Sequence, residues 1–213
     1  MSKTRVKICG VTTPDIVAAA AEAGAAYIGF VYFEKSPRHL GIAEAAKLAI
    51  DVPMGICKTV LLVNPSDDLL TTYLDQVPID MIQLHGSETP ERVKKVKALT
   101  GLPVMKAVGI SGPEDISKID DFASVADQIL VDAKPPKDAD LPGGNGLAFD
   151  WGLIAGRRWS VPWMLAGGLT PENVAEAVNR TGARQVDVSS GVEATPGVKD
   201  ADMISNFVSA AQI

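Results

Sequence analysis

The sequence predicts a single-domain α/β protein with the (β/α)8 TIM-barrel fold, the domain spanning residues 1–213. Two observations predict this class. Short apolar segments typical of strands alternate along the chain with segments of helical periodicity. The chain divides into eight such pairs of about 27 residues each, which is the spacing of a small barrel. A doubly wound open sheet is the alternative, but that fold would require a Gly-x-Gly-x-x-Gly turn after an early strand, and none is present.

The expected strands are short and rich in apolar residues, which suits a parallel sheet that is buried on both faces. The seventh, for example, is bounded by Pro162 before it and by Gly167 and Gly168 after it. The eight expected strands cover residues 5–9, 26–32, 58–63, 80–84, 103–108, 128–131, 163–166 and 185–188.

The expected helices begin at capping residues and end at glycine or at a polar stretch. The first begins within the Thr-Thr-Pro-Asp segment 12–15 and is stopped by Gly24, Ser66 caps the third, and Thr170 with Pro171 begins the seventh. The expected helices cover residues 12–22, 44–50, 67–74, 90–99, 113–119, a short stretch near 149–155, 170–178 and 200–211. A polar loop is expected at residues 33–41, and a loop rich in proline and glycine at 135–145.

Polar side chains are expected to gather at one end of the barrel. Side chains alternate between the two faces of a strand, and one face of a barrel strand points to the helices while the other points inward. Apolar residues occupy one face of four strands, and the opposite face carries Lys7 and Cys9, Gln83 and His85, Asp132, and Asp187. Most of these polar residues stand at or near the carboxyl ends of their strands, where barrel enzymes place their chemistry.

Two consecutive strands end in small residues that favour an anion. Gly167 and Gly168 follow the seventh strand, and Ser190 and Gly191 follow the eighth. Glycine allows a ligand to approach the backbone closely, and amides at turns or helix starts attract negative charge. One such pair alone is more simply explained as a tight turn, but two pairs after neighbouring strands favour a phosphate site.

Individual candidates also have ordinary explanations. Cys9 is either a buried thiol or a reactive group at a strand end, whereas Cys57 is interpreted as structural. His85 closes a strand, and acidic residues such as Asp132 are poor strand formers, so both favour a site. Arg38 lies in the loop after the second strand, where a solvated surface arginine is the common case.

The composition excludes several classes of protein. The net charge of −6, without a basic stripe, argues against nucleic-acid binding. No apolar run is long enough to span a membrane and no signal peptide is recognised, so we expect a cytoplasmic protein without a membrane partner. The two cysteines lack metal-site spacing, so reduced thiols and no metal are expected.

Seven short motifs, all in the same order, resemble the phosphoribosylanthranilate isomerase family, the barrel enzymes of tryptophan biosynthesis. They lie at residues 7–10 (Lys-Ile-Cys-Gly), 29–31 with 36–38, 83–86 (Gln-Leu-His-Gly), 131–132, 143–151, 166–169 and 187–193 (Asp-Val-Ser-Ser-Gly-Val-Glu). Two departures are minor: Asn145 stands where the family often has threonine, and the loop after Asp132 is unusually rich in proline.

The resemblance implies an Amadori rearrangement of a phosphosugar, N-(5-phosphoribosyl)anthranilate, without any cofactor. Asp132 would be the general acid and Cys9 the general base, and a nearby cation such as Lys7 is expected to lower the pKa of Cys9. Arg38 would bind the anthranilate carboxylate. The family pattern assigns the phosphate to the amides around Gly167, Gly168, Ser190 and Gly191, and the ribose to His85 and Asp187. These local donors would attract an anion that the net charge of the chain opposes.

Three alternatives remain open at this stage. Another phosphosugar isomerase or lyase of the same fold is possible, but the related Amadori enzyme of histidine synthesis would use paired aspartates in place of Cys9. A non-catalytic phosphate sensor would need only the phosphate site, and a Cys/His metal site would need clustered ligands. The oligomeric expectation is a monomer or a homodimer.

Overall fold

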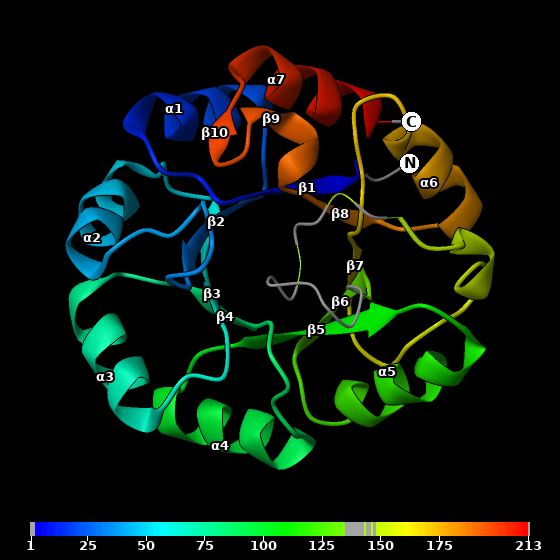
Figure 1. Ribbon diagram of the computed structural model, residues 1–213, viewed down its shortest axis with the longest axis horizontal. Helices are drawn as coiled ribbons and strands as arrows, with labels where there is room; N and C mark the ends of the chain where they lie inside the picture. Colours follow the sequence, from blue (N-terminus) through cyan, green and yellow to red (C-terminus); the bar gives the residue numbers. More distant parts are fainter. Residues whose placement is uncertain (1–2, 135–142, 144–145, 147, 213) are drawn as a thin grey trace.

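The computed structural model describes residues 3–134, 143, 146 and 148–212 and contains a closed barrel of eight parallel strands, each paired with its neighbours in sequence. The helices surround this barrel, as Figure 1 shows. The strands are β1 (Arg5–Cys9), β2 (Tyr27–Tyr32), β3 (Cys57–Leu62), β4 (Met81–Leu84), β5 (Val104–Ile110), β6 (Gln128–Ala133), β7 (Trp163–Leu165) and β8 (Gln185–Val188). The predicted TIM-barrel fold is therefore confirmed, and the open-sheet alternative is wrong because β1 pairs with β8.

Two helices begin at the capping side chains that the sequence indicates. Thr13 and Ser66 accept hydrogen bonds from backbone amides three residues later, and Gly24 adopts the left-handed conformation that ends the first helix. The α-helices are α1 (Pro14–Ala23), α2 (Ile42–Asp51), α3 (Asp67–Gln76), α4 (Pro90–Thr100), α5 (Ile116–Ala123), α6 (Val174–Thr181) and α7 (Ala201–Ala210). None of the helices in the described ranges is long and apolar enough to cross a membrane.

The predicted start of α6 at Thr170 is wrong, because the helix begins four residues later at Val174. The Asn173 side chain accepts a hydrogen bond from the Thr170 amide at 2.8 Å and donates one to the Gly168 carbonyl at 2.9 Å. These two bonds hold the intervening segment in a turn. The short helix predicted near 149–155 is present as a 3-10 helix, η2 (Trp151–Leu153). Most of the loop predicted at 135–145 lies outside the described residues.

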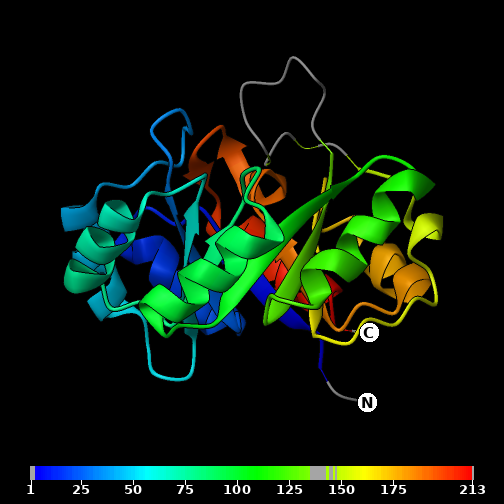
Figure 2. The same ribbon diagram turned by 90° about the horizontal axis from the view of Figure 1, so that it is seen from below.

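A small hairpin after β8 was not predicted. The chain forms a 3-10 helix, η3 (Ser190–Val192), and then the antiparallel strands β9 (Glu193–Thr195) and β10 (Val198–Lys199). A side chain at Gly197 would come within 2.5 Å of the Pro37 carbonyl oxygen, so the hairpin packs closely on the loop that carries Arg38. Figure 2 shows this hairpin and the 33–41 loop rising at the end of the barrel opposite the start of β1.

The alternation of side chains along the strands is confirmed. The apolar residues that share one strand face, among them Val6, Ile8 and Ile82, are fully buried in the layer between barrel and helices. The interior instead holds polar groups, including Lys7 and Gln83, together with a smaller apolar cluster of Tyr27, Met105, Ala107, Leu130, Met164 and Ala166. Burial of each large apolar side chain stabilises the fold by about 1.5–3 kcal/mol.

Candidate active site

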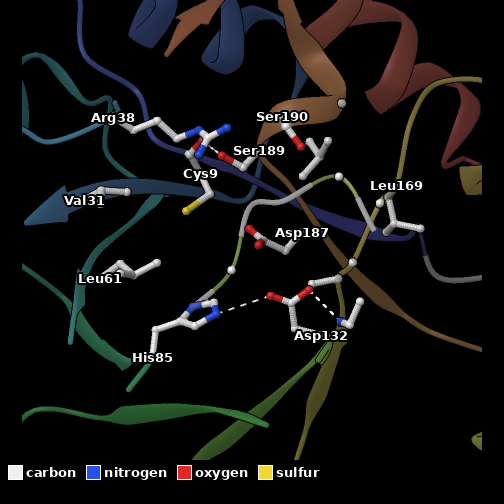
Figure 3. A pocket seen from close by; sticks show the side chains of 18 of the residues that line it. Cys9, Val31, Arg38, Leu61, His85, Asp132, Leu169, Asp187, Ser189 and Ser190 are labelled. Atoms are coloured by element: carbon white, nitrogen blue, oxygen red, sulfur yellow. Dashed lines mark hydrogen bonds and ion pairs between the residues drawn. The ribbon is translucent and has the colours of Figure 1, made fainter. Parts of the chain in front are cut away.

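A single pocket at the carboxyl ends of the barrel strands brings together all nine predicted site residues. Its lining includes Cys9, Arg38, His85, Asp132, Gly167, Gly168, Asp187, Ser190 and Gly191. Figure 3 shows the side chains of Cys9, His85, Asp132 and Asp187 directed into the same space. This convergence follows from the barrel, because every strand presents its carboxyl end on one face.

Asp132 is held in place from two sides. Its Oδ1 atom accepts a hydrogen bond from the Ala133 amide at 2.8 Å, and its Oδ2 atom lies 3.3 Å from His85 Nε2. The Gln83 side-chain amide lies 2.9 Å from the other ring nitrogen of His85. The carboxyl group is therefore oriented by the backbone of its own strand and by the His85 ring, which is itself contacted by Gln83 of β4.

Cys9 lies beside a buried ion pair. Lys7 Nζ is 2.9 Å from Asp187 Oδ1, and the Lys7 side chain is fully buried inside the barrel. Burial favours a neutral amine, but the adjacent Asp187 carboxylate outweighs it and the pKa of Lys7 is raised. Lys7 is accordingly a permanent cation next to the thiol, while Asp187 both lines the pocket and neutralises this lysine.

The pKa of Cys9 is not lowered overall, in contrast to the prediction. Burial raises the pKa of the thiol above its ordinary value, because a thiolate at this position would lose its contact with water. Lys7 and Lys199 act in the opposite direction, as expected of cations, but burial outweighs them. The resting form of Cys9 is therefore the protonated thiol.

Arg38 is buried, which excludes the ordinary explanation of a solvated surface arginine. Its guanidinium forms a two-point contact with Glu193, from Nε to Oε1 at 2.7 Å and from Nη2 to Oε2 at 2.9 Å. Its alkyl chain lies over Gly10, where an added Cβ would come within 2.7 Å of Arg38 Cδ and where φ is +79°. Glycine at position 10 therefore makes room for this arginine.

The two small-residue turns lie against each other beside Asp132. Gly167 and Gly168 have φ angles of +87° and +61°, and an added Cβ at Gly167 would come within 2.6 Å of the Ala133 amide nitrogen. An added Cβ at Gly191 would collide with the Leu169 carbonyl oxygen. Both glycines are thus required for close approach of the backbones to one another, whereas the prediction was that they allow a ligand to approach.

Backbone amides in these turns have unused hydrogen-bonding capacity. Ser190 and Gly191 open the 3-10 helix η3, and the first amides of a helix lack a partner within it. Within the described part of the chain, the amides of Gly168, Ser190 and Gly191 donate to no protein acceptor. Such amides, at the edge of a pocket, can bind an anion.

Sequence reasoning missed three residues that contact the site residues from outside the pocket lining. Glu193 belongs to a recognised motif but received no role, while Gln83 was noted only for its strand face. No sequence pattern around Lys199 indicates its role, because it reaches Glu193 and Ser189 only through the hairpin, which was not predicted. Among the described residues, no three His, Cys, Asp or Glu side chains are grouped so that they could hold a metal ion.

The fold and the pocket define a TIM-barrel protein with a buried carboxyl group, a buried thiol and two glycine-rich turns at the carboxyl ends of the barrel strands. Residues 6–210 match the sequence model of the N-(5'-phosphoribosyl)anthranilate (PRA) isomerase family. The chain belongs to this family. It is 60% identical to N-(5'-phosphoribosyl)anthranilate isomerase of Cereibacter sphaeroides strain ATCC 17023 over 212 residues, with 100% of both chains covered.

Solved structures of the family have the same architecture. Phosphoribosyl anthranilate isomerase from Thermotoga maritima superimposes with a TM-score of 0.88 at 35% identity, covering 98% of each chain. A phosphoribosyl anthranilate isomerase in complex with reduced 1-(o-carboxyphenylamino)-1-deoxyribulose 5-phosphate gives a TM-score of 0.84 at 33% identity, again over 98% of each chain.

Proposed function

We propose that this chain is an isomerase of tryptophan biosynthesis. The reaction converts N-(5-phosphoribosyl)anthranilate into 1-(2-carboxyphenylamino)-1-deoxyribulose 5-phosphate by an Amadori rearrangement. The observation that carries the proposal is the single pocket in which Asp132, Cys9, Arg38 and two glycine-rich turns meet. A substrate with a phosphate, a sugar and an aromatic carboxylate presents a matching set of groups.

Asp132 acts as the general acid. It protonates the furanose ring oxygen while the nitrogen lone pair forms a C1=N bond and the C1–O bond breaks, which opens the sugar ring. Two fixed contacts support this role, because they aim the carboxyl group into the pocket: the Ala133 amide at 2.8 Å and His85 at 3.3 Å. A positioned acid or base contributes typically 10²–10⁴-fold to a rate.

Cys9 acts as the general base. Its thiolate removes the proton from C2 of the opened imine, which gives an enol-amine, and the enol then becomes the C2 ketone as C1 gains a proton. The raised pKa of the resting thiol makes this thiolate costly, by about 1.36 kcal/mol for each pKa unit. The cation of Lys7 offsets part of that cost, and the positive charge of the imine lowers the barrier to removal of the C2 proton.

The remaining residues bind the substrate. Arg38 receives the anthranilate carboxylate, and the amides at Gly167, Gly168, Ser190 and Gly191 receive the phosphate. His85 and Asp187 line the ribose between these two ends. Charge-assisted hydrogen bonds of this kind supply the local attraction that a chain of net charge −6 needs for an anionic ligand.

The alternatives receive less support. A histidine-pathway isomerase would require a second aspartate at the end of β1, where this chain has Cys9. A phosphate sensor would not require a buried acid and a thiol in one pocket. We further propose that the protein works in the cytoplasm as a monomer or homodimer, with a small-molecule substrate and no nucleic-acid or membrane partner, which its acidic composition favours.

A fluorescence assay on the purified protein tests this function. Substrate formed from anthranilate and a phosphoribosyl donor loses its fluorescence as it is converted to product. We expect decay that is proportional to protein concentration and retained in Cys57→Ser. Decay no faster than the spontaneous rate would contradict the proposal, and turnover of the histidine-pathway aminoaldose alone would favour the alternative isomerase.

A further inference from the structure

Three charged side chains form a buried chain behind the pocket. Arg38, Glu193 and Lys199 have side chains that are 6%, 3% and 0% exposed. Glu193 contacts Arg38 through both oxygens, at 2.7 and 2.9 Å, and its Oε1 atom also lies 2.5 Å from Lys199 Nζ. Of these residues only Arg38 lines the pocket, so the other two reach a ligand only through it.

The contact with Glu193 leaves one edge of the arginine fork unused. A guanidinium has five N–H donors, and Glu193 takes those on the Nε and Nη2 side. In the described part of the chain, Arg38 Nη1 donates to no protein acceptor. The end-on edge formed by Nη1 and Nη2 is therefore available for a second, two-point contact with a carboxylate.

The position of the fork is fixed at several points. The alkyl chain of Arg38 lies on Gly10, and Glu193 also accepts a hydrogen bond from the Gly197 amide at 3.1 Å. Lys199 donates to the Ser189 carbonyl at 3.0 Å, which connects the β9–β10 hairpin to the end of β8. The hairpin thus acts as a rigid support behind the arginine.

The three side chains together carry a net positive charge that favours an anionic ligand. Arg38 paired with Glu193 alone would be neutral and would offer little attraction to an incoming anion. Lys199 adds a positive charge, so that the group carries one net positive charge in a buried setting. Water screens such a charge poorly there, which makes it effective at the pocket wall.

We propose that Glu193 and Lys199 are positioning residues for the aromatic carboxylate of the substrate. Glu193 holds Arg38 so that its end-on edge faces the ligand, and Lys199 offsets the charge of Glu193. This inference rests on the proposed function, in which Arg38 binds that carboxylate, and it assigns the β9–β10 hairpin a part in substrate selection.

The test compares two ligands that differ only in the carboxylate. One is reduced 1-(2-carboxyphenylamino)-1-deoxyribulose 5-phosphate, and the other is its phenylamino counterpart without the carboxylate. Dissociation constants are measured by calorimetry for the wild type and for the double variant Glu193→Gln/Lys199→Met. The double variant keeps the net charge of the group, because it removes one negative and one positive charge.

We expect the double variant to bind the carboxylate ligand about tenfold more weakly, as the loss of a well-placed charged hydrogen bond implies. The ligand without the carboxylate should bind within about twofold of wild type, and KM should rise more than kcat falls. Lys199→Met alone should weaken only the carboxylate ligand, because Glu193 then neutralises Arg38. The matched control is Glu176→Gln/Arg180→Met, an exposed pair on α6, which should change neither constant.

Unchanged preference for the carboxylate ligand in the double variant would overturn the inference, and so would equal weakening of both ligands, which a purely structural role predicts. If the double variant does not fold, unchanged binding by Lys199→Met overturns it instead. Arg38→Lys distinguishes the proposed role of Arg38 in carboxylate binding from the positioning role of Glu193 and Lys199. If Arg38→Lys keeps the preference, the proposed role of Arg38 fails; if only the double variant keeps it, the positioning role fails.

Discussion

His85 Nε2 lies 3.3 Å from Asp132 Oδ2, while the opposite ring nitrogen of His85 lies 2.9 Å from the side-chain amide nitrogen of Gln83. In this orientation of the Gln83 amide its nitrogen donates to Nδ1 of the histidine, so Nε2 directs its hydrogen toward Asp132. Gln83 is fully buried, whereas His85 and Asp132 line the pocket.

The contacts from Gln83 to His85 and from His85 to Asp132 predict the tautomer of His85. Nitrogen NMR of the labelled protein should show, for the neutral ring, a bare Nδ1 and a protonated Nε2. The chain has two histidines, and a His39→Asn variant assigns their signals. Gln83→Leu should remove the preference and reduce kcat by about tenfold, which is less than the 10²–10⁴-fold that a positioned acid typically contributes, because Asp132 itself remains. A protonated Nδ1 in the neutral ring of the wild type would contradict this arrangement.

The phosphate site can be tested with two substitutions at Gly168 that have nearly the same shape but differ in charge. Gly168 has a φ of +61°, which asparagine and aspartate tolerate best among residues with side chains. Gly168→Asp should weaken binding of ribose 5-phosphate by at least about tenfold, because a carboxylate repels the phosphate. Gly168→Asn should bind within about threefold of wild type, with the two folds compared by circular dichroism. Equal affinities in the two variants would exclude phosphate binding at this turn.

The role of Arg38 depends on the shape of its fork as well as its charge. Arg38→Lys keeps the positive charge but loses the two-point contacts with Glu193 and with the substrate carboxylate. We expect KM to rise about tenfold or more, since hydrogen bonds to charged groups are worth about 1.5–3 kcal/mol each. If lysine gives the same KM as arginine, Arg38 does not bind the substrate.

The raised pKa of Cys9 predicts the pH dependence of its reactivity. Because the thiolate is the reactive form, alkylation by iodoacetamide should accelerate through about pH 8.5, the ordinary thiol value, without levelling off below it. Cys57, whose pKa burial raises to about 11, is removed by Cys57→Ser so that mass spectrometry reports Cys9 alone. A rate that is already constant at neutral pH would show an activated thiolate in the free protein.

The fold and the pocket lining could be predicted because their signals are local. Strand alternation placed Cys9, His85 and Asp132 on one face, and the pairs of small residues after β7 and β8 identified the turns beside Asp132. Both features depend on a few neighbouring residues. The closed barrel then brings the strand ends together without further information from the sequence.

The remaining features depend on contacts between distant parts of the chain. Arg38 and Glu193 are 155 residues apart, and Lys7 and Asp187 are 180 apart, so no local pattern indicates either pair. The late start of α6 has a similar cause, because the bond from the Asn173 side chain to the Gly168 carbonyl replaces the helix start that local propensity favours at Thr170. The raised pKa of Cys9 reflects its burial, which the sequence does not specify.

The central claim is that Asp132 and Cys9 are the acid and base of the rearrangement, and the most direct measurement is turnover at saturating substrate. Asp132→Asn removes the acidic proton, and Cys9→Ser replaces the thiol with a hydroxyl that is far too weak an acid to supply an anionic base, both with little change in size. Cys57→Ser is the matched control for a cysteine outside the pocket. Each of the two site variants should lose at least about 10²-fold in kcat with substrate affinity nearly unchanged, while the control stays active. Near-normal kcat in either site variant would contradict the assignment of that residue.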